Sequence, residues 1–214
     1  MASPGFCPRC GSKLSSSSNF CSSCGISLSP PSTQTQPLIS GPHPTAFFNQ
    51  SEYVIDKKIL ALRDTFAVKN RQGELLGYVK KKIVSIGPQF WFEDLNGQRL
   101  GEVHGKILTI RHTYEIFNAS ALQLAVINKK IMKLFGTEWW LEAPPGIEVA
   151  RVQGNILNHD YSMVNPAKNP IAQVHKKWIS VRDSYCIEVF DTGFDRLLVL
   201  GFAIAMDSVQ FEEH

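Results

Sequence analysis

Residues 196–209 read RLLVLGFAIAMDSV, an almost wholly apolar stretch close to the end of this 214-residue chain. From Leu197 to Met206 no side chain carries a charge. A helix over this stretch would be hydrophobic on every side and would have to be buried on every side, in a membrane or in a protein core. About 14 helical residues span roughly 21 Å, which is shorter than the ~20 residues that a bilayer requires. We therefore predict a helix from about Phe194 to Val209 that the rest of the protein encloses, with no transmembrane span.

A sequence repeat before this stretch indicates what encloses the helix. The repeat has a period of 24 residues, and Phe66, Phe90 and Tyr114 occupy one of its positions. Each unit alternates apolar and polar residues on both sides of a polar turn, such as NRQG (70–73) or DLNG (94–97), and this pattern is typical of a β-hairpin. Together with the segments at either end, the units give about twelve strands in a meander, which form either a sandwich or a barrel.

The apolar stretch favours the barrel over the sandwich. A barrel of eight strands is filled by its own side chains, whereas a larger one leaves room for a helix inside. Small residues recur at one position of successive units, where a helix could approach the wall closely. An alternative is that they only relieve crowding between strands. These small residues are Gly77, Gly101, Ala125, Ala150 and Ala172.

Three segments, in the same order, resemble the LURP-one-related family. They are KKILALRDTFAVKNRQGELLGYVKKK (57–82), VHKKWISVRDSYCIEVFD (174–191) and LVLGFAIAMD (198–207). That family is grouped with tubby C-terminal domains and phospholipid scramblases, whose shared fold is a closed twelve-stranded antiparallel barrel around a hydrophobic C-terminal helix. The resemblance covers about residues 50–210 and implies this mainly β fold. It implies less about function, since tubby relatives bind phosphoinositide headgroups whereas scramblase relatives are associated with phospholipid movement and calcium.

Four cysteines near the N-terminus indicate a zinc site. Cys7 and Cys10 form one C-x2-C pair and Cys21 and Cys24 another, which together offer four thiolates to a tetrahedral ion. We see no signal peptide and expect a cytoplasmic, reducing compartment, in which clustered cysteines bind metal rather than form disulfides. The stretch resembles short zinc-ribbon modules. We predict a structural zinc ion with no open coordination position for catalysis.

The composition divides the chain into three parts. The zinc ribbon occupies residues 1–27. Residues 28–50 are rich in Pro, Ser, Thr and Gln and carry no charge, which is typical of a flexible linker. The barrel occupies residues 51–214.

The sequence contains no G-x-S-x-G, no H-E-x-x-H, no Walker-type glycine loop and no dinucleotide-binding fingerprint, so we predict no catalytic residues and no enzyme. The adjacent pair His159–Asp160 is the most suggestive candidate, but it lies between strand signals and lacks further ligands nearby in the sequence. The segment VFDTGFD (189–195) has only Asp191 and Asp195, too few oxygen ligands for a calcium loop. A scramblase-like activity is therefore not our leading hypothesis.

Lysines recur near the ends of the return strands of the hairpins. Because each hairpin goes out and back, these positions should gather toward one rim of the barrel. Two interpretations are open: the lysines serve solubility and discourage pairing between strand edges, or the rim binds an anionic phospholipid surface. We name these lysines as the candidate lipid-binding site. The lysines are Lys80, Lys81, Lys82, Lys106, Lys129, Lys130, Lys176 and Lys177.

The sequence thus supports a non-enzymatic adaptor as the leading function. Its barrel would dock on an anionic lipid or a protein, peripherally at membranes, and its zinc ribbon would contact a second partner. A nucleic-acid-associated regulator is the alternative, but the ribbon offers only Arg9 and Lys13 as cations, and a net charge of +3 demands no nucleic acid. An enzyme with its site in a groove outside the barrel is a third possibility.

Overall fold

The structure is a computed structural model, and it describes residues 46–60, 63–82, 85, 87–106, 113–132, 136–176 and 184–212. The cysteines Cys7, Cys10, Cys21 and Cys24, the linker up to residue 45, and Lys177 lie outside the described residues.

The described part of the chain contains twelve strands, two short 3-10 helices and one α-helix. In chain order they are η1 (Ala46–Phe48), β1 (Glu52–Leu60), β2 (Arg63–Asn70), β3 (Leu75–Lys81), β4 (Gln89–Asp94), β5 (Arg99–Lys106), β6 (Thr113–Asn118), β7 (Gln123–Met132), β8 (Gly136–Ala143), β9 (Ile147–Asn155), η2 (Ile156–Asn158), β10 (Asp160–Val164), β11 (Pro170–Lys176), β12 (Ser184–Val189) and α1 (Arg196–Glu212).

The strands form one closed antiparallel barrel. Each strand pairs with the next in the chain, and β1 also pairs with β12, with Ile55 opposite Tyr185. The predicted twelve-stranded barrel is therefore confirmed, and the sandwich is excluded. Closure leaves no strand edge exposed for pairing with another chain.

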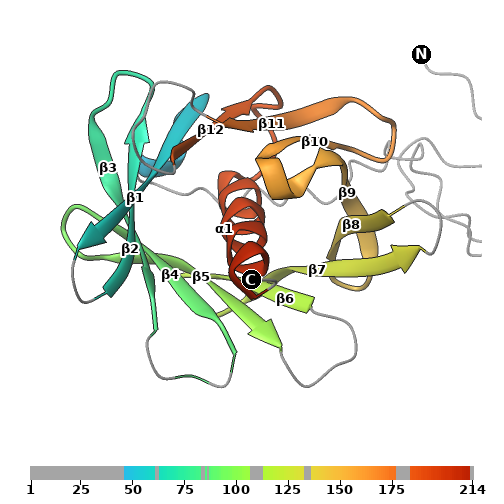
Figure 1. The fold of residues 1–214 in the computed structure, drawn as a ribbon, viewed down its shortest axis with the longest axis horizontal. Coiled ribbons are helices and arrows are strands. Elements are labelled where there is room, and N and C mark those ends of the chain that lie inside the picture. Colours follow the sequence, from blue (N-terminus) through green and yellow to red (C-terminus); the bar gives the residue numbers. More distant parts are fainter. Residues whose placement is uncertain are drawn as a thin grey trace, which may run out of the picture. The chain divides into compact units, whose positions relative to one another are not determined.

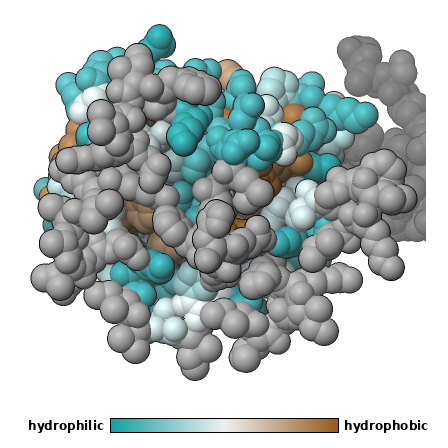
Figure 2. Space-filling view, viewed as in Figure 1, coloured by the Kyte–Doolittle hydropathy of each residue, from teal (hydrophilic) through white to brown (hydrophobic). Residues whose placement is uncertain are grey.

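Alternation along each strand separates an inner from an outer face. In β4, Phe90 and Phe92 are buried inside the barrel, while the intervening Trp91 and the following Glu93 are only half-buried. Tyr114 and Ile116 repeat this arrangement in β6. In the view of Figure 2, hydrophilic side chains cover most of the coloured surface and hydrophobic ones appear only in small areas.

Four of the hairpins use the same turn. In each, an Asn or Asp side chain accepts a hydrogen bond from the backbone N–H four residues later, and the residue before that N–H has a left-handed conformation. The first two turns place Gly73 (φ 83°) and Gly97 (φ 78°) there, but the other two place Ala121 (φ 60°) and Lys168 (φ 66°). The polar turns expected from the sequence are therefore present, with residues other than glycine at a position that favours it.

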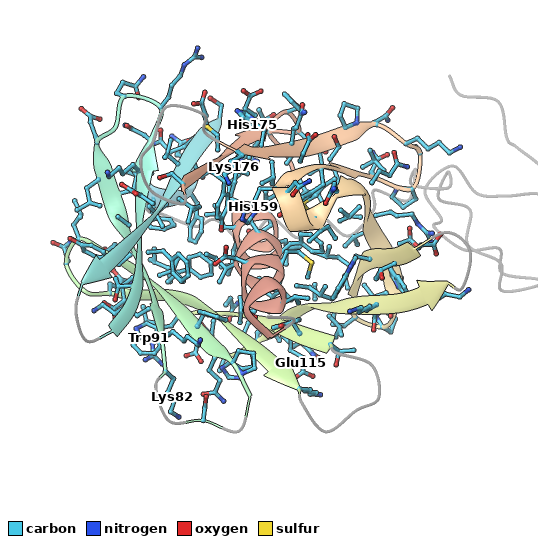
Figure 3. The ribbon with its side chains drawn as sticks, in the orientation of Figure 1. Lys82, Trp91, Glu115, His159, His175 and Lys176 are labelled. Carbon is cyan, nitrogen blue, oxygen red and sulfur yellow. The ribbon has the colours of Figure 1, made fainter. Side chains whose placement is uncertain are left out.

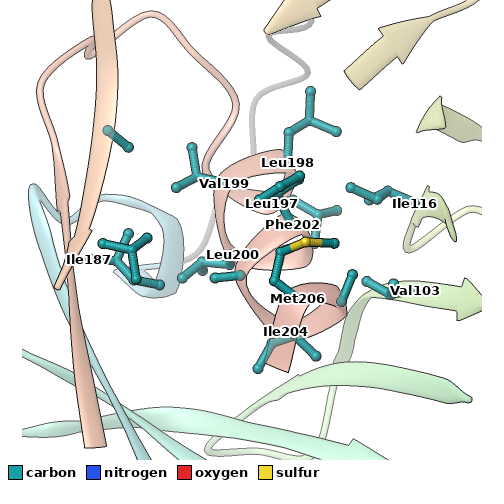
Figure 4. Close-up of a cluster of buried hydrophobic side chains, with 14 of the residues drawn as sticks. Val103, Ile116, Ile187, Leu197, Leu198, Val199, Leu200, Phe202, Ile204 and Met206 are labelled. Carbon is teal, nitrogen blue, oxygen red and sulfur yellow. The ribbon is translucent and has the colours of Figure 1, made fainter. Parts of the chain in front are cut away.

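The helix α1 runs through the middle of the barrel (Figure 1). Every residue from Leu197 to Val209 is buried, as the apolar stretch predicted. In Figure 4 the helix side chains Phe202 and Met206 lie near Val103 and Ile116 of the barrel wall. Among the described residues no helix is long and apolar enough to cross a membrane.

The start of α1 differs slightly from the sequence-based expectation. The helix begins at Arg196 rather than near Phe194, and Asp195 precedes it. The Asp195 carboxylate accepts a hydrogen bond from the Leu197 N–H at 2.8 Å, so it caps the helix N-terminus instead of lying in its first turn. The Arg196 guanidinium donates to the carbonyls of Gln50 and Phe194 and thereby ties the helix start to the chain before β1.

The repeated small residues do not all face the helix. At Gly101 an added Cβ would lie 2.5 Å from a methyl group of Leu197, so this glycine lets α1 approach the wall as predicted. At Gly77 the same atom would meet the Phe47 ring at 2.8 Å, which shows that this position faces η1 instead. Phe47 is 2% exposed and belongs to the core. The segment before β1 therefore fills the space beside Gly77, where we had expected the central helix.

Candidate functional site

The return strands β3, β5, β7 and β11 end at the same end of the barrel, and the predicted basic rim lies there. This is also the end that holds the last turns of α1, because Tyr114, near the start of β6, shares a 2.8 Å hydrogen bond with Ser208 of the helix. Positive charge near a helix C-terminus is favourable, which is one structural reason for lysines at this end. We call this end the basic rim and define it by the lysines listed above, apart from Lys177.

The described lysines of the basic rim differ in exposure. Lys80, Lys81 and Lys129 are half-buried. In Figure 3 Lys82 lies at the outer margin of the molecule, away from the helix. The exposed lysines are Lys82, Lys106, Lys130 and Lys176.

Three of these lysines have partners within the barrel wall. Lys80 pairs with the Glu93 carboxylate, and Lys106 pairs with Glu115 at 2.5 Å. The Lys129 ammonium lies 5.0 Å from the centre of the Trp139 ring, a cation–π distance. These three side chains interact with other residues of the barrel wall. Fewer lysines are therefore available to bind a ligand than the sequence suggested.

The Glu93 carboxylate shows the electrostatic effect of this pairing. Burial raises its pKa, but hydrogen bonds from Lys80 and Trp91 and the charge of Lys80 lower it more, so the pKa lies below its ordinary value. Glu93 is therefore held in its charged form, and part of the positive charge of Lys80 is neutralised locally.

The other exposed lysines are spread around the ring. Lys82 follows β3, Lys130 lies two residues before the end of β7, and Lys176 ends β11. The strand order places each of these strands four positions from the next. The charges of these three described lysines are therefore distributed around the end of the barrel rather than gathered on one side. Asp160, exposed at the start of β10, is an acidic residue at the same end.

Inside this end, the structure places a buried polar cluster that the sequence did not reveal. His159 follows η2 in a left-handed conformation (φ 49°), and its Nε2 atom lies 3.5 Å from the Asp207 carboxylate. The ring of His159 stacks on Tyr185, with centroids 4.4 Å apart. Figure 3 shows His159 beside the helix, within the ring of strands.

Two tyrosines complete the cluster. Burial and the negative charge of Asp207 both raise the pKa values of Tyr161 and Tyr185 above their usual value, so the two phenols stay neutral. Asp207 is fully buried, although it lies in a helix that is otherwise almost entirely apolar. The cluster lies against the C-terminal part of α1.

The suggestive pair His159–Asp160 thus separates in the structure. His159 turns inward to Asp207 of α1, while Asp160 is exposed. In the sequence, Asp207 stands out only as the first charged residue after the apolar run. Nothing in the sequence links it to His159. The cluster joins the residue after η2 with residues from β10, β12 and α1, which only the closed barrel brings together.

The described residues contain no group of three or more His, Cys, Asp or Glu side chains arranged to hold a metal ion. Cys186 is the cysteine within this part of the chain; it is buried, and its Sγ atom lies 3.3 Å from a Glu52 oxygen. The four predicted zinc ligands belong to residues that the structure does not describe.

Comparisons with known proteins give consistent results for the two parts of the chain. A zinc-ribbon domain model matches residues 6–28, and a LURP-one-related model matches residues 51–207. Among solved structures, a crystal structure of a protein from Arabidopsis thaliana is similar, with a TM-score of 0.54 and 15% sequence identity. The similarity covers 76% of this chain and 94% of that protein, and at this identity it supports the fold alone. No curated protein sequence matches. Because the LURP-one-related model spans most of the chain and the barrel and its central helix are those expected of it, the protein belongs to the LURP-one-related family.

Proposed function

We propose that this protein is a non-enzymatic binding protein whose barrel docks on an anionic phospholipid surface through the basic rim. The observation that supports this most is the set of exposed lysines, Lys82, Lys130 and Lys176, spread evenly around one end of the barrel. The interior, where an enzyme of this architecture would hold its substrate, is filled by α1. A surface contact is therefore better supported than an internal site.

Flotation with lipid vesicles tests the basic rim. At low salt the protein should float with vesicles that contain phosphatidylserine, and binding should fall steeply as salt rises. Replacing Lys82, Lys130 and Lys176 with Gln should weaken vesicle binding by roughly 100-fold, because each surface lysine contributes ~1 kcal/mol. This set is a sharper test than replacing Lys80, whose charge is already paired with Glu93.

A matched control removes the same charge from the other end of the barrel. Lys168 is exposed in its turn, while Arg71 (76% exposed) and Arg99 (52% exposed) pair with Glu52 and Glu102, so this variant controls for net charge. Replacing these three residues with Gln should leave vesicle binding nearly unchanged. Equal losses in the two variants would mean that net charge, rather than the basic rim, controls binding. No binding to anionic vesicles at low salt would rule out the lipid and favour a protein partner.

We further propose that Cys7, Cys10, Cys21 and Cys24 hold one structural zinc ion and that the ribbon contacts a second partner. Support comes from the donor set, four thiolates in two C-x2-C pairs, and from the match of residues 6–28 to a zinc-ribbon model. The purified chain should contain about one zinc ion per molecule by elemental analysis. Cys21→Ala should release this zinc without changing the melting temperature of the barrel.

Cys186→Ala is the matched control for the zinc measurement. Cys186 is buried in the barrel, so its replacement should leave the zinc content unchanged. If removal of zinc lowered the melting temperature of the barrel, the ribbon and barrel would not be independent modules.

A further inference from the structure

The β4–β5 turn holds the one Asn-Gly pair of the sequence, Asn96–Gly97. A backbone nitrogen that follows an asparagine can attack the side-chain amide, and glycine leaves that nitrogen most accessible because it has no side chain. Asn96 is exposed, and Gly97 has a left-handed conformation (φ 78°). Apart from its chain neighbours, no atom of the described residues lies within 4 Å of the position that a Gly97 Cβ would occupy. The amide and the nitrogen therefore lie together at an open hairpin tip.

The other three turns of this kind use their asparagines to support the turn. Asn70, Asn118 and Asn165 each begin a turn, and each side-chain oxygen accepts a hydrogen bond from the backbone N–H four residues later. In the β4–β5 turn Asp94 has this role instead. The Asn96 Nδ2 atom lies 3.5 Å from an Asp94 carboxylate oxygen, longer than a typical hydrogen bond. The Asn96 amide is therefore held less firmly than the amides that begin the other turns.

The residue that follows each asparagine also distinguishes Asn96. Asn118 is followed by Ala119, whose methyl group hinders attack by the alanine nitrogen. Asn165 is followed by Pro166, whose nitrogen carries no hydrogen and cannot react in this way. Only Asn96 combines an exposed amide outside the supporting position with a following glycine.

We propose that Asn96 is a site of spontaneous deamidation. The Gly97 nitrogen attacks the Asn96 Cγ atom and forms a C–N bond, and the side-chain nitrogen takes up the Gly97 proton and leaves as ammonia. Water then opens the resulting cyclic imide at either of its two carbonyls. One opening gives aspartate, and the other gives isoaspartate, in which the main chain runs through the former side chain.

The structure of the turn sets how often this reaction can begin. The Gly97 N–H donates to the Asp94 carbonyl oxygen at 3.1 Å, and the Asp94 N–H donates to the Gln98 carbonyl oxygen at 3.1 Å. While these hydrogen bonds hold, the Gly97 nitrogen is engaged, so the tip has to open before the nitrogen attacks. Local opening at an exposed tip costs far less free energy than global unfolding. The reaction should therefore be slower in the folded protein than in a free peptide, but not abolished.

Isoaspartate disrupts this turn. The Asp94 carboxylate accepts hydrogen bonds from the Asn96 N–H at 2.9 Å and from the Gln98 N–H at 2.8 Å. Isoaspartate inserts an additional main-chain atom between these two N–H groups, and either product places a second negative charge beside Asp94. The hairpin tip should lose hydrogen bonds as a result. The change lies at the turn end of the hairpin and does not depend on the proposed lipid contact.

Incubation of the full chain at mildly alkaline pH, followed by trypsin digestion and mass spectrometry, measures the modification. The tryptic peptide 83–99 contains Asn96 as its only asparagine. The modified fraction should increase with time, with the small mass gain that accompanies replacement of an amide –NH2 by –OH. Separation into two products, one of them a substrate for a purified isoaspartyl methyltransferase, would identify the isoaspartate. A synthetic peptide of residues 83–99 should react faster than the folded chain.

Asn118 is the matched control within the same molecule and should stay unmodified over the same period. Asn96→Gln should remove the modification, because the longer side chain closes its ring far more slowly, and Asp94 still supports the turn. Aged native protein should melt about 2–4 °C below fresh protein, whereas aged Asn96→Gln should not. An unmodified Asn96 in the folded chain after the peptide has reacted fully would overturn the proposal. Equal modification of Asn118 would overturn the argument that the turn selects Asn96.

Discussion

Replacing Ala203 with arginine should abolish soluble folding of the barrel. Ala203 is fully buried in the middle of α1, between Phe202 and Ile204, and both of these neighbours are also fully buried. An arginine there would put a charge without a partner into an apolar core, at a cost comparable to the whole stability of a domain, about 5–15 kcal/mol. Expression followed by measurement of the soluble fraction and of a cooperative thermal transition would show the loss.

Ala167→Arg provides the matched control for this prediction. Ala167 is exposed in the turn between β10 and β11, so the same substitution there should change stability by no more than about 0.5 kcal/mol. A soluble Ala203→Arg protein that melts near the native temperature would show that α1 is not enclosed. A native chain that fractionated with membranes and resisted both salt and carbonate washes would lead to the same conclusion.

Gly77→Ala should be the most destabilising of the conservative substitutions, by about 3 kcal/mol or more. In β3, Gly77 pairs with Val68 on one side and Asp94 on the other. An added methyl group would overlap the backbone carbonyl oxygen of Glu93 and lie 2.8 Å from the Phe47 ring. The ring can shift, but the carbonyl belongs to the paired strand β4 and cannot move without breaking the local register. Urea unfolding would measure the difference in free energy of unfolding.

Gly193→Ala is the control for Gly77→Ala. At Gly193 the nearest atom to an added Cβ is an Asp191 oxygen at 3.4 Å, an ordinary contact. The change in free energy of unfolding should therefore stay within about 1 kcal/mol. Similar losses of unfolding free energy in both variants would mean that the cost comes from replacing a flexible glycine, rather than from close packing against Glu93 and Phe47.

The family assignment and the fold depended on patterns that act over short distances in the chain. The alternation of inward-facing apolar residues with other residues in segments such as 89–94 specified which side chains face inward, because successive residues of a strand point to opposite faces. Asn and Asp at the first turn position specified four hairpins through hydrogen bonds to a backbone N–H four residues away. The length and polarity of 196–209 specified a buried helix. Each signal lies within one element or one turn, and so it could be predicted.

The candidate sites depended on contacts between distant parts of the chain, and the sequence predicted them only in part. It gathered the lysines at one end, but not the pairing of Lys80 with Glu93, which depends on the register between β3 and β4. It grouped His159 with its neighbour in the chain, whereas the structure pairs it with Asp207, 48 positions away. The physical reason is that closure, strand register and the position of the helix are properties of the whole barrel, and they decide which polar side chains share the small space inside it. The sequence by itself determined the strands, the turns, the buried helix and the four cysteines of the ribbon. Only the tertiary structure decided which charges are paired and which glycine faces Phe47.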